Sequence, residues 1–153
     1  MTYLVLKILH IVGATVLFGT GLGIAFFLFV AVRSRNVALI AGTLRTVVIA
    51  DFVFSAPAVV AQLVTGSLLA ETLGFTFTEP WLIASLALYL GVGLCWLPVV
   101  AIQIRMRRLA EQAVADAAPL PEPFRRLYRV WFALGWPAFI GVIGIVALMV
   151  IKP

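Results

Sequence analysis

The amino-acid sequence predicts an all-α membrane protein, folded as a four-transmembrane-helix antiparallel bundle with both termini outside. Of its 153 residues, 64% are hydrophobic and only 11% are charged, whereas an ordinary soluble domain has about 25% charged residues. The apolar residues form continuous runs instead of alternating with polar ones, which excludes a membrane β-barrel. The basic residues gather around two of the three loops, as is typical of multi-pass membrane proteins.

Four apolar runs are long enough to cross a bilayer, because a spanning helix needs about 20 mostly apolar residues. We therefore expect a single transmembrane domain over residues 1–153. The first run is about twice as long as the core of a signal peptide, so we expect it to be retained as a helix. The predicted helices lie at about residues 3–32, 46–70, 81–104 and 130–151, with residues 105–129 as a cytoplasmic segment. Its first part, residues 105–118, is expected to extend the third helix or to form an interfacial helix.

The first two helices carry residues that predict how they pack. In the first, Gly19 and Gly23 form a small-xxx-small pair, which permits the close approach of another helix. The short loop at residues 34–43 makes the first two helices antiparallel neighbours. In the second, Pro57 lacks a backbone N–H, and we expect it to kink the helix.

The third and fourth helices have recognisable ends. Pro80 stands at the start of the third helix, where its missing N–H costs little, and Trp81 is expected at the outer membrane interface. Arg129 and Trp131 are expected to anchor the fourth helix at the inner headgroups. Cys95, the single cysteine, lies mid-span and is expected to be a small packing residue.

The placement of the charges predicts the orientation of the chain. Residues 71–80, in the second loop, hold two acidic residues and no Lys or Arg. Because basic loops stay in the cytoplasm, we expect the first and third loops to lie there, with the lipid bilayer and not nucleic acid as the partner of the +5 net charge. The arginines that flank the first and third loops are Arg33, Arg35, Arg45, Arg105, Arg107, Arg108, Arg125, Arg126 and Arg129.

Polar residues inside the predicted spans are functional candidates, because they are costly in a bilayer. They recur every three or four residues, so each of the first three helices carries one stripe of polar or small residues that we expect to face the bundle interior. On the second helix the stripe is Asp51, Ser55, Ala58, Gln62 and Thr65. On the third helix it is Ser85, Tyr89, Val92, Trp96 and Gln103, and we expect these two stripes to face each other. By depth, the polar residues form an outer layer of His10, Gln62 and Tyr89 and an inner layer of Asp51, Arg45 and Gln103.

His10 is the only histidine, and its role has three alternatives: ligand to a metal or haem, proton shuttle, or hydrogen-bonding residue. One histidine cannot make a closed zinc site, but it can supply one axial ligand to haem iron. Tyr89, or His10 of a second copy in a homodimer, is a candidate second ligand. We expect Gly13 to leave space for a flat cofactor and Gln62 or a backbone carbonyl to hold the second ring nitrogen.

Asp51 has two interpretations. It is a proton-carrying carboxylate, or it is the ion-pair partner of Arg45 or of an arginine in the third loop. The sequence contains no nucleophile–base pair, phosphate-binding loop or paired carboxylates, so it supports no hydrolase of the soluble type and leaves open whether the protein is an enzyme.

Several motifs resemble a known family. They are Leu6-Lys7-Ile-Leu-His10, Ala56-Pro57-Ala58-Val59-Val60-Ala61-Gln62 with Thr65-Gly66, Leu88-Tyr89, Cys95-Trp96-Leu97-Pro98-Val99 with Gln103-Ile-Arg105-Met106, Trp131-Phe-Ala-Leu-Gly135, Pro137-Ala-Phe139 and Leu148 to Pro153. Over nearly its whole length, the chain resembles the bacterial integral membrane proteins grouped as domain of unknown function 2269. That resemblance implies a multi-pass, four-helix protein of the bacterial cytoplasmic (inner) membrane and no particular function.

A shorter likeness connects the first helix to haem proteins. Leu6-Lys7-x-x-His10, opening a four-helix bundle, is similar to HemJ-type protoporphyrinogen oxidases and CopD-type copper-resistance proteins. The resemblance implies that His10 ligates haem b. The HemJ type also depends on a lysine in its third helix, and the third helix here has none, so protoporphyrinogen oxidation is not implied.

Three functions follow as alternatives. The first is a haem-b-binding membrane protein with a redox or haem-metabolism role through His10. The second is a small transporter or metal-handling protein that uses the polar layers. The third is a non-catalytic accessory membrane subunit.

Overall fold

The computed structural model describes residues 1–152; Pro153, the last residue of the predicted domain, lies outside them. The described chain is helical and contains no strand. Four helical stretches are long and apolar enough to cross a membrane, so the predicted all-α fold with four spans is confirmed. The elements are α1 (Thr2–Arg33), α2 (Val37–Ala50), the π-helical turn η1 (Asp51–Ser55), α3 (Ala56–Thr72), α4 (Pro80–Ala115) and α5 (Glu122–Ile151).

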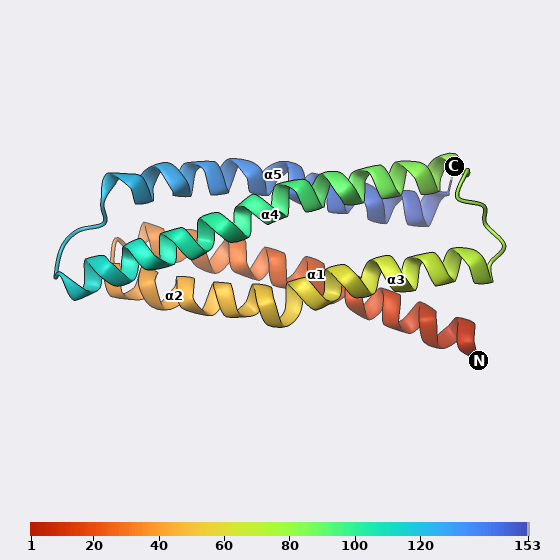
Figure 1. Ribbon diagram of the computed structural model, residues 1–153, viewed down its shortest axis with the longest axis horizontal. Helices are drawn as coiled ribbons and strands as arrows, with labels where there is room; N and C mark the ends of the chain where they lie inside the picture. The colour runs from red at the N-terminus through yellow and green to blue at the C-terminus, as the bar shows by residue number, and fades with distance from the viewer. Residues whose placement is uncertain (153) are drawn as a thin grey trace.

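The helices run up and down along one long axis (Figure 1). One end of the molecule holds both termini and the loop between α3 and α4, and we name it the terminal end. The other end holds the loops between α1 and α2 and between α4 and α5. Of the 11 basic residues, all but Lys7 and Lys152 belong to the half of the molecule next to these two loops, which we name the arginine-rich end.

Three helices, α2, α4 and α5, extend beyond the spans predicted for them. α2 begins at Val37, so the predicted loop at residues 34–43 is wrong in extent. The cause is a cap: the side chain of Asn36 accepts a hydrogen bond from the N–H of Leu39 at 3.0 Å, which allows the helix to start early. α4 and α5 likewise continue through most of residues 105–129, leaving only residues 116–121 as a connection.

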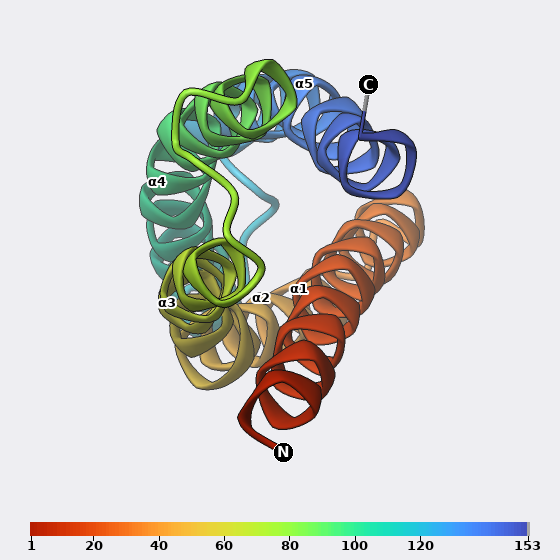
Figure 2. The same cartoon turned by 90° about the vertical axis from the view of Figure 1, so that its right-hand side faces the viewer.

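The two halves of the bundle pack differently. Toward the terminal end, α1 and α3 diverge from α4 and α5 (Figure 2). There the buried apolar core consists of Ala70, Trp81 and Leu82. The arginine-rich half holds a larger buried cluster, formed by Ile24, Leu28, Ala31, Ile40, Ala41, Leu44, Val47, Ile102, Met106, Ala110, Phe124 and Trp131.

The second span is interrupted where α2 meets α3. In η1 the N–H of Ala56 donates to the carbonyl of Asp51, five residues back instead of four. Pro57 follows directly and has no N–H to restore the normal ladder. The chain bends at this point (Figure 1), so the predicted kink near Pro57 is confirmed and takes the form of a π-helical turn.

Candidate functional site

A buried carboxylate lies at the π-helical turn. Asp51 is 4% exposed and sits where α2, η1 and α4 meet. The indole N–H of Trp96, on α4, donates to Asp51 Oδ1 at 3.5 Å. Ser55, also buried, follows on the same turn. π-helical turns inside α-helices are frequent at functional sites, and this one positions Asp51, the only acidic residue within the spans predicted at residues 3–32, 46–70, 81–104 and 130–151.

Gln103 connects this carboxylate to α5. Its side chain is 1% exposed and lies between Asp51 and the indole of Trp131. Because an indole N–H can only donate, the Gln103 amide oxygen must accept from Trp131 Nε1, at 3.2 Å. The amide nitrogen then donates to Asp51 Oδ2, at 2.5 Å. α4 thus supplies two neutral donors to Asp51, and α5 is connected to the carboxylate indirectly, through the bond from Trp131 to Gln103.

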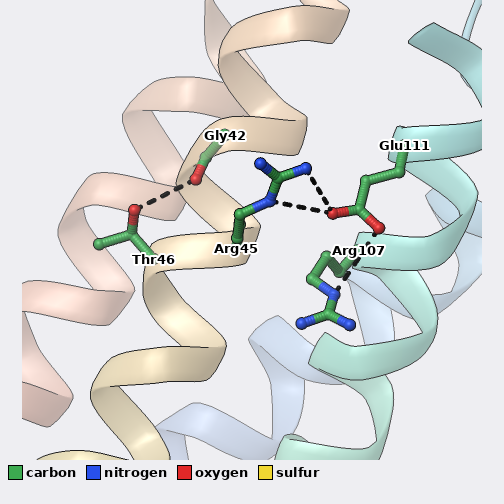
Figure 3. A network of polar contacts seen from close by, with 5 residues as sticks. All are labelled: Gly42, Arg45, Thr46, Arg107 and Glu111. Atoms are coloured by element: carbon green, nitrogen blue, oxygen red, sulfur yellow. Dashed lines mark hydrogen bonds and ion pairs between the residues drawn. The ribbon is translucent and has the colours of Figure 1, made fainter. Parts of the chain in front are cut away.

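The predicted ion pair of Asp51 is wrong. Within residues 1–152, Asp51 takes part in no ion pair. Arg45 instead bonds to Glu111 through Nε at 3.2 Å and Nη2 at 3.1 Å, and Arg107 approaches the other Glu111 oxygen at 3.8 Å (Figure 3). The predicted inner layer therefore divides: Asp51 and Gln103 are in contact, whereas Arg45 belongs to this separate network.

The physical reason is exposure. The side chain of Arg45 is 66% exposed, and that of Glu111 33% exposed, so both charges keep access to the surface. An arginine turned toward Asp51 would have to leave that surface for the buried core, at a cost in desolvation. The Arg45–Glu111 pair is best understood as a connection between α2 and α4.

His10 is held by α3. Its Nδ1 lies 2.9 Å from the hydroxyl oxygen of Thr65, and that hydroxyl also donates to the carbonyl of Ala61 at 2.6 Å. A hydroxyl has one proton, so Thr65 must accept from His10. The ring proton is therefore on Nδ1, and Nε2 carries a lone pair. Nε2 has no hydrogen-bond partner among the described residues and is not sealed from the surface.

Gln62 has a different role from the one predicted. Its amide nitrogen donates to the backbone carbonyl of His10 at 2.7 Å and does not contact the ring. The space beside Gly13 is filled, because a Cβ there would collide with the Gln62 amide. The expected slot for a flat cofactor at Gly13 is therefore wrong. Gly66 in turn makes room for the His10 ring, whose Cε1 would lie 3.2 Å from a Cβ.

Tyr89, the third member of the predicted outer layer, contacts neither His10 nor Gln62. Its hydroxyl donates to the carbonyl of Val59, on α3, at 2.5 Å. The polar stripes of the second and third helices thus face each other at Asp51 and Trp96, but Gln62 and Thr65 turn toward α1. The prediction that the two stripes face each other along their length is wrong at Gln62.

The sequence reasoning missed the role of Trp131. The sequence indicates only a membrane anchor there, yet the residue is 6% exposed and its N–H bonds to Gln103. The N–H of a buried indole needs a hydrogen-bond acceptor, so a tryptophan near the start of the fourth helix could have indicated a polar partner on a neighbouring helix. The described residues contain no group of three or more His, Cys, Asp or Glu side chains that could hold a metal ion, so a metal bound at His10 would need other ligands.

The comparisons with known proteins support the membrane assignment. Residues 4–153 match the model of a family described as predicted integral membrane protein, DUF2269. The chain belongs to this family. No curated protein and no solved structure matches it. Family membership therefore establishes an integral membrane protein with four spans, and the function has to be argued from the two sites.

Proposed function

We propose that this DUF2269 protein binds haem b, with Nε2 of His10 as an axial ligand. The observation that supports the proposal is the hydrogen-bond chain from His10 Nδ1 through Thr65 to Ala61. Histidine ligands generally donate their other ring N–H to an acceptor, which fixes the tautomer and aims the lone pair. Here Thr65 is the acceptor, and the lone pair on Nε2 is unused.

Neighbouring residues hold His10 in a position from which it could ligate haem. Gly66 allows the ring to lie against α3, and Gln62 holds the α1 backbone at His10. The Tyr89 hydroxyl donates a hydrogen bond to the Val59 carbonyl, and this bond would have to break before Tyr89 could act as a second ligand. We therefore propose a single ligand per chain, or one from each chain of a homodimer. Haem bound there would supply one-electron redox chemistry.

We further propose that the arginine-rich end lies in the cytoplasm of a bacterial cell and that both termini face outward across the inner membrane. The support is the absence of Lys and Arg from the loop between α3 and α4. Thr76, in the loop between α3 and α4, and Ala115, the last residue of α4, are both exposed, and these two segments lie at opposite ends of the molecule (Figure 1). In a Cys95→Ala background, an impermeant maleimide applied to intact cells should label Thr76→Cys and not Ala115→Cys. The reverse pattern would overturn the orientation.

The haem proposal is tested by the absorbance spectrum of protein produced with ample haem. The natural chain should show a Soret band at a stoichiometry of one haem per chain or per pair of chains. His10→Ala should lose it, since the only proposed iron ligand is gone. A colourless natural chain would refute haem binding, and an unchanged Soret band in His10→Ala would refute the ligand.

Two further variants make this test specific. Thr65→Val removes the acceptor for Nδ1 and should shift or weaken the Soret band while leaving the ligand in place. Asp51→Asn, in the other half of the molecule, should leave the band unchanged. Circular dichroism of each variant verifies that the helices are intact, so that loss of colour is not loss of fold.

A second function is favoured by Asp51. A buried carboxylate that is held only by neutral donors can take up and release a proton without breaking an ion pair, so we also propose a proton-coupled transporter as the alternative. Intramembrane carboxylates commonly mark proton and ion pathways. Liposomes containing the protein and a pH-sensitive dye should show proton flux that Asp51→Asn abolishes and His10→Ala retains. Equal flux in Asp51→Asn and the natural chain would refute it.

A further inference from the structure

A groove at the arginine-rich end is separate from both sites described above. It has a volume of about 820 Å³ and lies between the end of α1, the start of α2 and the start of α5. Its wall includes the buried apolar side chains of Ile40 and Phe124. Its rim carries the guanidinium groups of Arg35, Arg125 and Arg129.

The charge of the rim is only partly balanced. Glu122 also lines the groove, and it pairs with Arg126 at 3.5 Å and Arg129 at 3.9 Å. Arg35 and Arg125 form no ion pair within the described chain. The groove therefore presents two guanidinium groups without an acidic partner beside an apolar wall.

Tyr128 adds a third kind of contact. Its ring stacks on Trp131 with centroids 5.7 Å apart, and its half-buried side chain lines the groove. The phenol has no hydrogen-bond partner among residues 1–152, although a phenol is both donor and acceptor. Arginine forks and a phenol together are suited to the oxygens of a phosphate group.

We propose that this groove binds an anionic phospholipid, with the phosphate at Arg35, Arg125 and Tyr128 and an acyl chain along Ile40 and Phe124. The position supports a lipid: the groove lies where α1 ends and α5 begins, next to the arginines that we expect to anchor α5 at the headgroups. Basic pockets between helices at a membrane surface commonly hold anionic headgroups. A free phosphate would share the arginines but would leave the apolar wall unused.

The test is the binding of short-chain phosphatidylglycerol to the purified protein in detergent, followed by native mass spectrometry. Each arginine near an anionic headgroup is worth about fivefold in affinity, so Arg35→Gln/Arg125→Gln should weaken binding about 25-fold. The matched control is Arg105→Gln/Arg108→Gln, which removes the same charge from exposed positions outside the groove and should leave binding nearly unchanged.

Several results would overturn the proposal. Equal weakening in the two double variants would show a general charge effect. Equal binding of phosphatidylglycerol and short-chain phosphatidylcholine would remove the preference for an anionic headgroup. Inorganic phosphate that binds as tightly as phosphatidylglycerol would assign the site to a free anion. Tyr128→Phe keeps the stacked ring and removes only the hydroxyl group. It should lower the affinity for phosphatidylglycerol by less than the arginine double variant does, which measures the contribution of the hydroxyl group apart from that of the ring.

Discussion

The two halves of this bundle treat a polar residue in opposite ways. In the arginine-rich half, Asp51 is enclosed by Trp96 and Gln103 and by a continuous apolar cluster. In the terminal half, His10 has one nitrogen bound to Thr65 and the other without a partner among the described residues, and few apolar residues are buried nearby. A polar group whose bonds are all satisfied contributes to the fold, whereas one with an unused lone pair is available to a ligand.

The difference originates in what each helix contributes. α4 and α5 reach the packed half with large side chains such as Met106 and Phe124, both fully buried. Near the terminal end, α1 and α3 interlock through small residues: Gly13 receives Gln62, and Gly66 receives His10. That pairing joins α1 to α3, whereas α3 meets α4 through the bond from Tyr89 to Val59 and the small cluster of Ala70, Trp81 and Leu82.

The largest expected effect is in the packed half. Leu44→Ala removes a side chain with 0% exposure from the main cluster and should lower the free energy of unfolding by about 2 kcal/mol. Leu69→Ala, at a half-buried position on α3 in the terminal half, is the matched change and should cost much less. Unfolding in mixed micelles with increasing SDS, followed by circular dichroism, measures both. Equal losses would show that the halves are equally packed.

The next comparison is between two glutamines. Gln103→Leu leaves Asp51 without one donor and Trp131 without its acceptor, so we expect a loss of about 2 kcal/mol. Gln62→Leu removes one bond between helices, worth about 1 kcal/mol. The same unfolding experiment ranks them. A larger loss in Gln62→Leu would contradict the assignment of Asp51 to an enclosed network.

How much of this could be read from the sequence depends on the property. Hydropathy locates the four spans, because a run of about 20 apolar residues matches the thickness of the hydrocarbon core of a bilayer. Pro57 locates the kink in the second span. The partner of Asp51 could not be predicted, since it depends on which face α4 turns toward η1. Nor could Thr65 be chosen over Gln62 as the partner of the His10 ring: the two lie on one stripe, and a small rotation of α3 exchanges them.

The smallest expected effects on stability are at the glycines of α1, where a packed glycine can be compared with one that has no close neighbour. Gly13→Ala places a methyl group against the Gln62 amide, which must move, and we expect a loss of about 1 kcal/mol. Gly19 and Gly23, the small-xxx-small pair of the sequence, have no neighbour within 4 Å of the position that a Cβ would take, so no helix of the described chain packs closely against them. Gly19→Ala should therefore be neutral in the same unfolding assay, and a loss equal to that of Gly13→Ala would contradict the α1–α3 interlock.

The most direct test of the central claim is the reaction of His10 with diethylpyrocarbonate in the natural, haem-free protein. His10 is the only histidine, so the ultraviolet band of carbethoxyhistidine reports on it alone. Lys7, exposed one turn earlier on α1, reports by mass spectrometry that the reagent reaches this part of the helix. We predict that His10 reacts through its free Nε2 and that bound haem protects it. A His10 that stays unmodified while Lys7 reacts fully would contradict the open nitrogen on which the account depends.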